Sequence, residues 1–230
     1  MDEPTSASAL TGETLDRAGV AALAASHGPA HLVDCDLEGA DLSGIDMTGW
    51  RFDRCNMRRT DLAGAQLEGS RWQSCRAPFA GFSRANLADA VIASCDFNNA
   101  VLRGARLSGA AFIGCKLTGA DLSDAGGLDA RFEETLLVGA KLPGHSFRKQ
   151  TLRRVDFAQA DLRKADFREA VLEGCSLRDA NVAGARFDKA DLRGADLGGL
   201  RLTDANLFRG ATISRHQAGE LLAELGLKVA

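Results

Sequence analysis

The sequence predicts an all-β solenoid, in which the chain winds as a quadrilateral parallel β-helix of about nine coils with a helix at each end. Three observations lead to this fold. A large apolar residue recurs at every fifth position, a small residue stands two positions before it, and all six cysteines follow a twenty-residue spacing. A period of five matches neither an α-helix nor an ordinary β-strand, so repeated corners are expected.

The five-residue period starts at Leu32 and runs without insertion to Leu207. Of its 36 positions, 34 hold Leu, Phe, Met, Ile, Val or Trp, and the exceptions are Ala77 and Gly127. The position two residues earlier is Ala in 21 cases and Cys in six. Residues two apart in an extended segment point the same way, so both classes should face inward. The positions rich in Gly, Asp, Asn, Ser and Arg should form corners, where Asx side chains bond backbone amides.

The cysteines indicate how many sides close one coil. They stand at twenty-residue steps, with one longer step of sixty before the last: Cys35, Cys55, Cys75, Cys95, Cys115 and Cys175. Chance would place all of them on one of four sides roughly once in a thousand cases, so four sides per coil is our interpretation. Coils ~4.8 Å apart then make a rod of roughly 40 Å. Metal ligands converge on one point, so we expect these thiols to be buried packing residues without metal, disulfide or redox chemistry.

Several runs follow the pattern A(D/N)Lxx, among them ADLSG, ANLAD, ADLRKADFRE and ADLRGADLGG. Over residues 30–209 the sequence therefore resembles the pentapeptide-repeat family. The resemblance implies that the quadrilateral β-helix is right-handed. We expect three segments: residues 1–29 as a disordered tail and capping helix, 30–209 as the β-helix, and 210–230 as a C-terminal helix and dimerisation segment.

At the N-terminal side, the stretch TGETLDRAGVAALAASHGP predicts the capping helix, and its Gly-Pro ending is a stop signal. We expect one helical face to carry Leu15, Ala18, Ala22 and Leu23. Open strand edges at the end of a β-helix invite aggregation unless they are covered. This helix is therefore expected to cover the first coil.

The C-terminal stretch GATISRHQAGELLAELGLKVA predicts a second helix. Ser214 and Gln217 have capping-box spacing, and Gly226 stands where a helix-ending glycine is expected. Leu227 and Val229 then suggest a short final strand. The stretch is too apolar for a solvent-facing lid, so we expect an assembly surface, with these candidate residues: Ile213, Leu221, Leu222, Leu225, Leu227 and Val229.

The sequence contains no motif of a nucleophile elbow, phosphate loop, dinucleotide site or zinc protease, so we expect no enzyme, no cofactor and no metal. His145 and Gln150 occupy inward positions on successive sides, where they are expected to satisfy each other as a buried pair. Two interruptions remain, at SCRAPFAGF and DAGGLDA. There Phe79 and Leu128 either point outward, with Phe79 as a candidate exposed contact, or turn inward beside a small core residue.

The C-terminal ending resembles that of topoisomerase-interacting pentapeptide-repeat proteins of the Qnr, MfpA, McbG and AlbG type. This resemblance implies a C-terminal homodimer that mimics duplex DNA. Its partner would be DNA gyrase or topoisomerase IV, which it would inhibit or protect from quinolones or peptide toxins. Such mimicry needs carboxylates laid out like phosphates. The candidate acidic surface consists of Asp36, Glu38, Asp41, Asp46, Asp61 and Glu68.

The charge pattern supports DNA mimicry only in part. Residues 1–70 carry 12 acidic and 5 basic side chains, whereas residues 71–230 carry 19 and 23. Later coils are basic at Arg148, Lys149, Arg153, Arg154, Arg163, Lys164 and Arg168. A protein-interaction scaffold unrelated to topoisomerases therefore stays open as the alternative. Without a signal peptide or an apolar run of membrane length, we expect a cytoplasmic protein with no membrane and no direct nucleic-acid contact.

Overall fold

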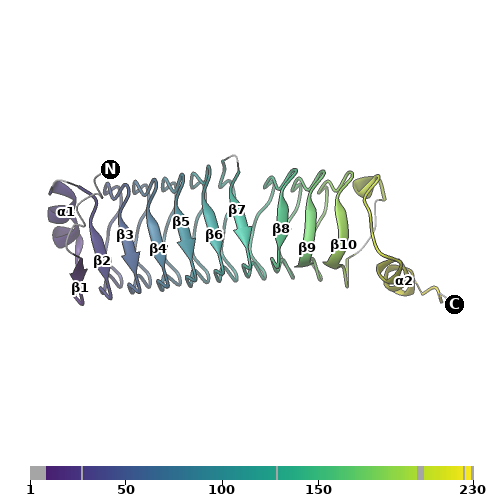
Figure 1. Cartoon of the computed structure of the whole chain (residues 1–230), viewed down its shortest axis with the longest axis horizontal. Coiled ribbons are helices and arrows are strands. Elements are labelled where there is room, and N and C mark those ends of the chain that lie inside the picture. The colour runs from purple at the N-terminus through teal and green to yellow at the C-terminus, as the bar shows by residue number, and fades with distance from the viewer. Residues whose placement is uncertain (1–8, 27, 128, 201–204, 225, 229–230) are drawn as a thin grey trace, which may run out of the picture.

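Parallel strands pair in sequence order along one side of a rod (Figure 1). The structure is a computed structural model that describes residues 9–26, 28–127, 129–200, 205–224 and 226–228. The strands are β1 (Leu10–Thr11), β2 (His31–Val33), β3 (Arg51–Asp53), β4 (Arg71–Gln73), β5 (Val91–Ala93), β6 (Ala111–Ile113), β7 (Arg131–Glu133), β8 (Thr151–Arg153), β9 (Val171–Ser176) and β10 (Asp191–Asp196).

The other three sides of each coil are held by single bridges between residues twenty apart. Asp36 pairs with Asn56 on one side, and Asp41 pairs with Asp61 on the next. On the strand side, the same step pairs Phe52 of β3 with Trp72 of β4. Because the sides repeat after twenty residues along the length of the rod, with steps of 21 or 22 only at its two ends, the predicted quadrilateral parallel β-helix is confirmed.

The inward residues form one continuous core along the rod. Large side chains such as Phe52, Trp72 and Phe157 are at most 1% exposed, and small ones such as Ala65 and Ala165 are fully buried between them. Aromatic rings stack from coil to coil, with Phe167 and Phe187 centroids 4.8 Å apart. The predicted alternation of small and large inward positions is therefore confirmed for these residues, and the hydrophobic effect is the main stabilising term.

The corners are two-residue turns whose second residue has a left-handed backbone conformation. Glycine or a short polar residue tolerates this conformation best. The aspartate that opens a side bonds the amide two residues later, as Asp41 does with Ser43 and Asp46 does with Thr48, both at 3.0 Å. The expected structural role of these aspartates is confirmed.

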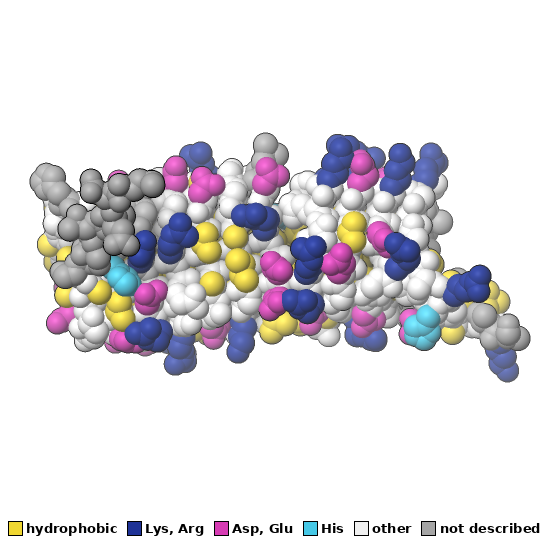
Figure 2. Space-filling model, in the orientation of Figure 1, with side chains coloured by type: hydrophobic (Ala, Val, Ile, Leu, Met, Phe, Trp, Pro, Cys, Tyr) yellow, Lys and Arg dark blue, Asp and Glu magenta, His cyan; other side chains and the backbone are white. Residues whose placement is uncertain are grey.

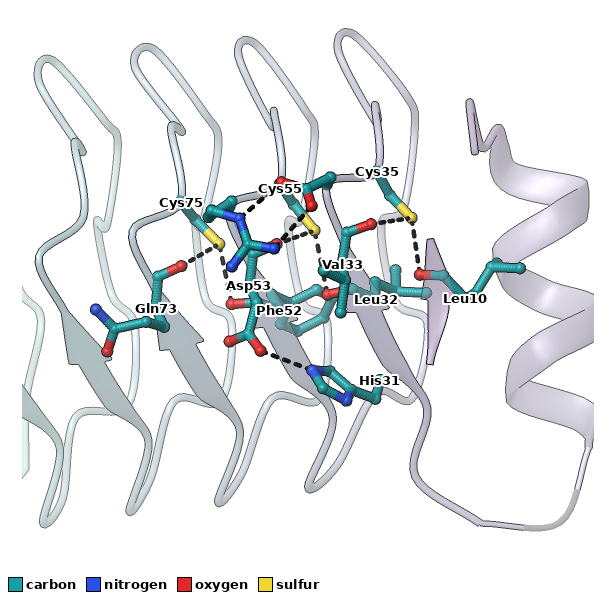
Figure 3. A network of polar contacts seen from close by, with 12 residues as sticks. Leu10, His31, Leu32, Val33, Cys35, Phe52, Asp53, Cys55, Gln73 and Cys75 are labelled. Carbon is teal, nitrogen blue, oxygen red and sulfur yellow. Dashed lines mark hydrogen bonds and ion pairs between the residues drawn. The ribbon is translucent and has the colours of Figure 1, made fainter. Parts of the chain in front are cut away.

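All six cysteines are free and buried. Figure 3 shows Cys35, Cys55 and Cys75 in a row, each donating its thiol to a backbone carbonyl oxygen. For Cys75 this acceptor is the oxygen of Phe52 on the preceding coil, 3.1 Å away. Thr135 occupies the same inner wall and its hydroxyl donates to the Phe112 oxygen at 3.0 Å. The wall thus accommodates a small side chain that carries a hydrogen-bond donor.

We expect the native protein to resist thiol reagents. The six cysteines are at most 2% exposed, so a reagent has no access to their thiols in the folded protein. For Cys175, burial also raises the thiol pKa to about 11. Titration with an aromatic disulfide reagent should detect no thiol in the native state and six in guanidinium chloride. Rapid reaction of even one native thiol would contradict the buried placement.

The N-terminal end of the rod is covered by β1 and by α1 (Arg17–Ala25). The Asp16 side chain caps α1 by accepting a hydrogen bond from the Gly19 amide at 2.9 Å. Val20 is fully buried, whereas Ala18 and Ala22 are exposed. The predicted inward face is therefore right for Leu15 and Leu23, which are partly buried and pack against the core, and wrong for Ala18 and Ala22. The helix starts only at Arg17 and turns Val20 toward the core. The strand β1 was not foreseen.

At the C-terminal end, a short 3₁₀ helix η1 (Ala205–Phe208) precedes α2 (Arg215–Glu224). The predicted capping box is present: the Ser214 amide donates to the Gln217 side-chain oxygen at 2.6 Å, and the Gln217 amide donates to the Ser214 hydroxyl at 3.2 Å. The Gln217 side-chain nitrogen also donates to the carbonyls of Leu192 and Ala195, both at 2.6 Å. One buried side chain therefore ties α2 to the edge of β10.

The end of α2 confirms the predicted helix-ending role of Gly226 but not the predicted strand at Leu227. Gly226 has φ +82, and the Leu227 amide donates to the Leu222 carbonyl at 3.0 Å. This is the pattern of a glycine-ended helix, in which the residue after the glycine bonds back to the last turn. Leu227 thus completes the helix end and is not part of the predicted strand, while Val229 lies outside the described residues.

The ladder between coils changes at β7 and β8. At the start of this strand side in other coils, a backbone amide donates a hydrogen bond to the carbonyl oxygen 21 residues earlier. The Arg131 amide, for example, donates to the Ala110 oxygen at 2.8 Å. At the next coil the Gln150 side chain donates to the Ala130 carbonyl at 3.1 Å. Gly127 lies so close to the preceding coil that a Cβ there would be 2.3 Å from the Ser108 nitrogen. The interruption at DAGGLDA is therefore a local irregularity of the solenoid.

His145 lies buried beside this irregularity. Its ring packs 4.6 Å from Phe147 and 5.8 Å from Phe132, and its Nε2 atom is buried without a hydrogen-bond partner. The predicted mutual pairing of His145 with Gln150 is wrong, because Gln150 bonds the backbone of the neighbouring coil. Burial lowers the pKa of His145 to about 4, so its ring is neutral at physiological pH.

Candidate interaction surfaces

The six acidic candidates are exposed but do not form a single row. The twenty-residue repeat places Asp41 directly beside Asp61 on one side, whereas Asp36 and Asp46 belong to two other sides. Since phosphates of a duplex follow continuous paths, a mimic needs its carboxylates in comparable rows. The candidate surface is therefore a patch that wraps around the first coils.

Basic or amide groups accompany several of these carboxylates. Arg17 lies 3.1 Å from Asp41, Arg58 lies 3.6 Å from Glu38, and Asn56 donates to Asp36 at 2.9 Å. Hydrogen bonds from Ser43 hold the pKa of Asp41 below its ordinary value, which keeps this carboxylate ionised. The patch is anionic, but the nearby arginines reduce its field.

The later basic coils are largely neutralised by their neighbours. Among the basic residues singled out there, all but Lys164 form ion pairs, such as Arg153 with Glu173 at 3.0 Å and Arg148 with Glu169 at 3.3 Å. Figure 2 shows acidic and basic side chains mixed along the visible face of the rod. Exposed pairs of this kind contribute little stability, so their main effect is a surface of mixed charge.

The strand side carries an apolar area at its centre. Val91 and Ala93 of β5 lie beside Ala111 and Ile113 of β6, and Ile113 is 40% exposed. Figure 2 shows this area as a hydrophobic cluster on the middle of the visible face, with charged side chains around it. Apolar groups rimmed by charge are typical of protein contact surfaces.

Phe79 points outward, with 51% of its surface exposed. The guanidinium carbons of Arg58 and Arg59 each lie 5.9 Å from the ring centroid. The inward alternative for Phe79 is wrong because the core beside Ala77 is already occupied. Trp72 lies 5.9 Å from the rings of both Phe82 and Phe97, which stack on each other at 5.2 Å. Leu128, the other residue in question, lies outside the described residues.

The C-terminal candidates divide into three groups. Ile213, Leu222 and Leu227 are 37%, 38% and 55% exposed. Leu221 is only 8% exposed and packs against the core of its own chain. Leu225 and Val229 lie outside the described residues. An exposed apolar group therefore stands at the end of the rod, while Leu221 anchors α2.

The described part of the chain offers no group of three or more His, Cys, Asp or Glu side chains that could hold a metal ion. Within the same residues, neither helix has the length and hydropathy needed to cross a bilayer. The features that stand out are thus surfaces: the acidic first coils, the apolar centre of the strand side, Phe79 with its arginines, and the C-terminal end.

A sequence profile for pentapeptide repeats matches eight copies, over residues 35–71, 82–125, 130–169 and 170–207. The gaps between the first three matched ranges contain the two interruptions of the repeat, with Phe79 in one and Gly127 in the other. No curated protein sequence matches the chain.

Among solved structures, the chain is similar to HetL, a pentapeptide-repeat protein involved in heterocyst differentiation regulation from the cyanobacterium Nostoc sp. strain PCC 7120. The two share 26% identity over 81% of this chain and 86% of HetL, with a TM-score of 0.66. Full-length QnrB1, a plasmid-mediated fluoroquinolone resistance protein, shares 22% identity over 95% of this chain and 97% of its own, with a TM-score of 0.64. With the repeat profile covering more than half of its residues, the chain belongs to the pentapeptide-repeat family.

Proposed function

We propose that this chain is a protein-binding rod. The observation that carries the proposal is the continuity of its four sides, on which outward residues repeat every twenty positions and stand on a rigid ladder. Such a rod presents charged and apolar groups at fixed spacing with little ordering cost on binding, which favours recognition of a protein surface. The six reduced, buried thiols are compatible with action in the cytosol.

A type II topoisomerase, DNA gyrase or topoisomerase IV, is our first candidate partner. The shared fold with QnrB1 over nearly the whole chain supports this candidate, as does the acidic patch of the first coils. Binding would inhibit the enzyme or protect it from quinolones or peptide toxins. The mixed charge of the later coils restricts any mimicry of DNA to residues near the N-terminal end. A scaffold with an unrelated protein partner is the second candidate, which the mixed charge favours.

Supercoiling by purified gyrase, with and without a quinolone, tests the first candidate. We expect inhibition or drug protection at micromolar protein, weakened several-fold when Asp36 and Asp46 are both changed to Asn. Asparagine keeps the side-chain oxygen that accepts the corner hydrogen bond, so the fold is retained and only charge is removed. Asp96→Asn with Asp156→Asn is the matched control, because these aspartates accept the same corner bond in later coils.

Two outcomes of this assay decide between the candidates. Absence of both inhibition and protection removes the topoisomerase candidate and leaves the scaffold. Equal effects of the two sets of Asn substitutions would show that the acidic patch is not the contact, even if gyrase is the partner.

We also propose that two rods join end to end through their C-terminal segments. The exposed Ile213, Leu222 and Leu227 support this assembly, since all three belong to the last described residues and end the rod with apolar surface. A twofold contact would cover that surface and the neighbouring strand edge at the same time. The resulting homodimer would carry the two acidic patches at its outer ends.

A further inference from the structure

Phe79 occupies a corner position that normally excludes its residue type. Its backbone φ is +61, in the left-handed region. The other described non-glycine residues with positive φ are all polar or charged, and glycine fills the same corner column at Gly39, Gly119 and Gly139. A left-handed conformation costs an ordinary residue roughly 1–2 kcal/mol, so the chain retains an aromatic ring at a position that disfavours it.

Core packing does not account for this ring. The space beside Ala77 is filled by Trp72, Phe82 and Phe97, and Ala77 itself is fully buried. Half of the Phe79 surface stays exposed. A hydrophobic side chain held outward in a strained corner is a feature found at functional sites.

The charges around Phe79 are basic and partly unused. Arg58 and Arg59 flank its ring, and Arg76 opens the same side three residues before it. Arg58 is engaged with Glu38 at 3.6 Å. Within the described residues, Arg59 and Arg76 form no ion pair with a carboxylate. One cation without an ion pair, Arg59, therefore lies beside the exposed aromatic face, and a second, Arg76, stands on the same side of the coil three residues before Phe79.

We propose that Phe79, Arg59 and Arg76 form a docking surface for an acidic segment of a partner protein that also carries an aromatic side chain. The proposal rests on the proposed role as a protein-binding rod and names the chemistry of the partner. Carboxylates of the partner pair with the two arginines, and its aromatic side chain packs against Phe79.

A protein segment fits this surface better than a nucleic acid. Nucleic-acid grooves need a track of cations along the backbone. Along the rod, the corner column of Phe79 continues with Asn99 and Gly119, which carry no charge. On the other side the first coil presents Asp36 and Glu38, which repel phosphates. The cationic area is therefore short and suits a few carboxylates.

Fluorescence anisotropy with three labelled probes tests the proposal: a glutamate–tyrosine copolymer, polyglutamate and single-stranded oligothymidylate. We expect the copolymer to bind best at low salt. Phe79→Gly should weaken its binding roughly five- to tenfold, which corresponds to about 1 to 1.4 kcal/mol for a lost aromatic contact. The double variant Arg59→Gln with Arg76→Gln should weaken the binding of the copolymer and the binding of polyglutamate to the same extent.

Asp179→Gly is the matched control, because Asp179 occupies the same corner column with φ +54 and lies five coils away. It should leave copolymer binding unchanged. The melting temperature of Phe79→Gly should stay within about 3 °C of the parent, since relief of the left-handed strain offsets the packing lost by a half-exposed ring.

Three results overturn the proposal: no binding of the copolymer, unchanged binding by Phe79→Gly, or binding of oligothymidylate alone with loss in the same variant. The third result identifies a nucleic-acid surface instead. If the copolymer binds Phe79→Gly as tightly as the parent, the docking surface at Phe79 is excluded, but the proposal of a protein-binding rod still stands. The two proposals can therefore be tested separately.

Discussion

Acidification from pH 6.5 to about 4 should destabilise the protein by up to about 3 kcal/mol through His145 alone. The ring is buried between Phe132 and Phe147, and no hydrogen bond to its Nε2 atom compensates for the lost water. Burial therefore lowers the pKa of His145 from 6.5 to about 4. The effect follows from the preference of the folded state for the neutral ring.

The direction of the effect is fixed by proton uptake. Above pH 6.5 the ring is neutral in both states, and the folded protein has its full stability. As the pH falls below 6.5, His145 takes up a proton in the unfolded chain, whereas in the folded chain it stays neutral until about pH 4. Stability is lost across this window and the loss is complete below it. Each unit of pKa difference corresponds to about 1.4 kcal/mol.

Replacement of His145 by Leu should remove this loss. Urea denaturation at several pH values measures it as the difference in unfolding free energy between the variant and the parent. We expect the variant to be the more stable protein at neutral pH as well, since an unpartnered buried nitrogen is eliminated. The difference should grow as the pH is lowered.

Phe187→Leu is the control for packing, because Phe187 is fully buried two coils from Phe147, stacks on Phe167 and Phe208, and does not titrate. Its destabilisation should be the same at every pH. The carboxylates elsewhere in the chain are the same in both proteins, so their contributions cancel in the comparison. A pH profile of His145→Leu parallel to that of the parent would contradict a buried neutral histidine.

The repeat made the fold predictable to an unusual degree. Each side contains its own inward pair and its own corner, so local sequence is sufficient to define the coil, and the cysteine spacing defined its four sides. The contacts between coils were harder to foresee. Gln150 and Gln217 both donate to backbone carbonyls of another coil, and neither bond follows from the five-residue pattern.

The candidate surfaces were predictable as residue types but not as pairings. The exposure of Asp36 and Asp41 follows from their outward position in the repeat. Their partners depend on which side chains meet across twenty residues or across the end of the rod, as Arg17 meets Asp41. The orientation of the Phe79 side chain was ambiguous in the sequence. It depends on whether the side chains of Trp72 and Phe97 are large enough to fill the core beside Ala77, which the five-residue pattern does not show.

Assembly of two rods should depend on Leu222. Its side chain is 38% exposed on α2, near the exposed Leu227. An aspartate in its place puts an unpaired carboxylate into the proposed apolar contact, which costs several kcal/mol. Since every 1.4 kcal/mol is a factor of ten, Leu222→Asp should raise the dissociation constant of the dimer at least about 100-fold. Sedimentation velocity over a range of concentrations measures this change.

Leu136→Asp is the matched control, because Leu136 is a leucine of nearly equal exposure, 40%, on the side of the rod. The Leu136→Asp variant should remain a dimer. The comparison then shows whether dissociation depends on the position of the substitution or only on the added charge. Leu221→Asp has a different expected outcome: Leu221 is 8% exposed in the core, so a charge there should detach α2 and lower the melting temperature. A parent protein that sediments as a monomer at every concentration, or a Leu222→Asp variant that stays dimeric, excludes a contact through this end of the rod.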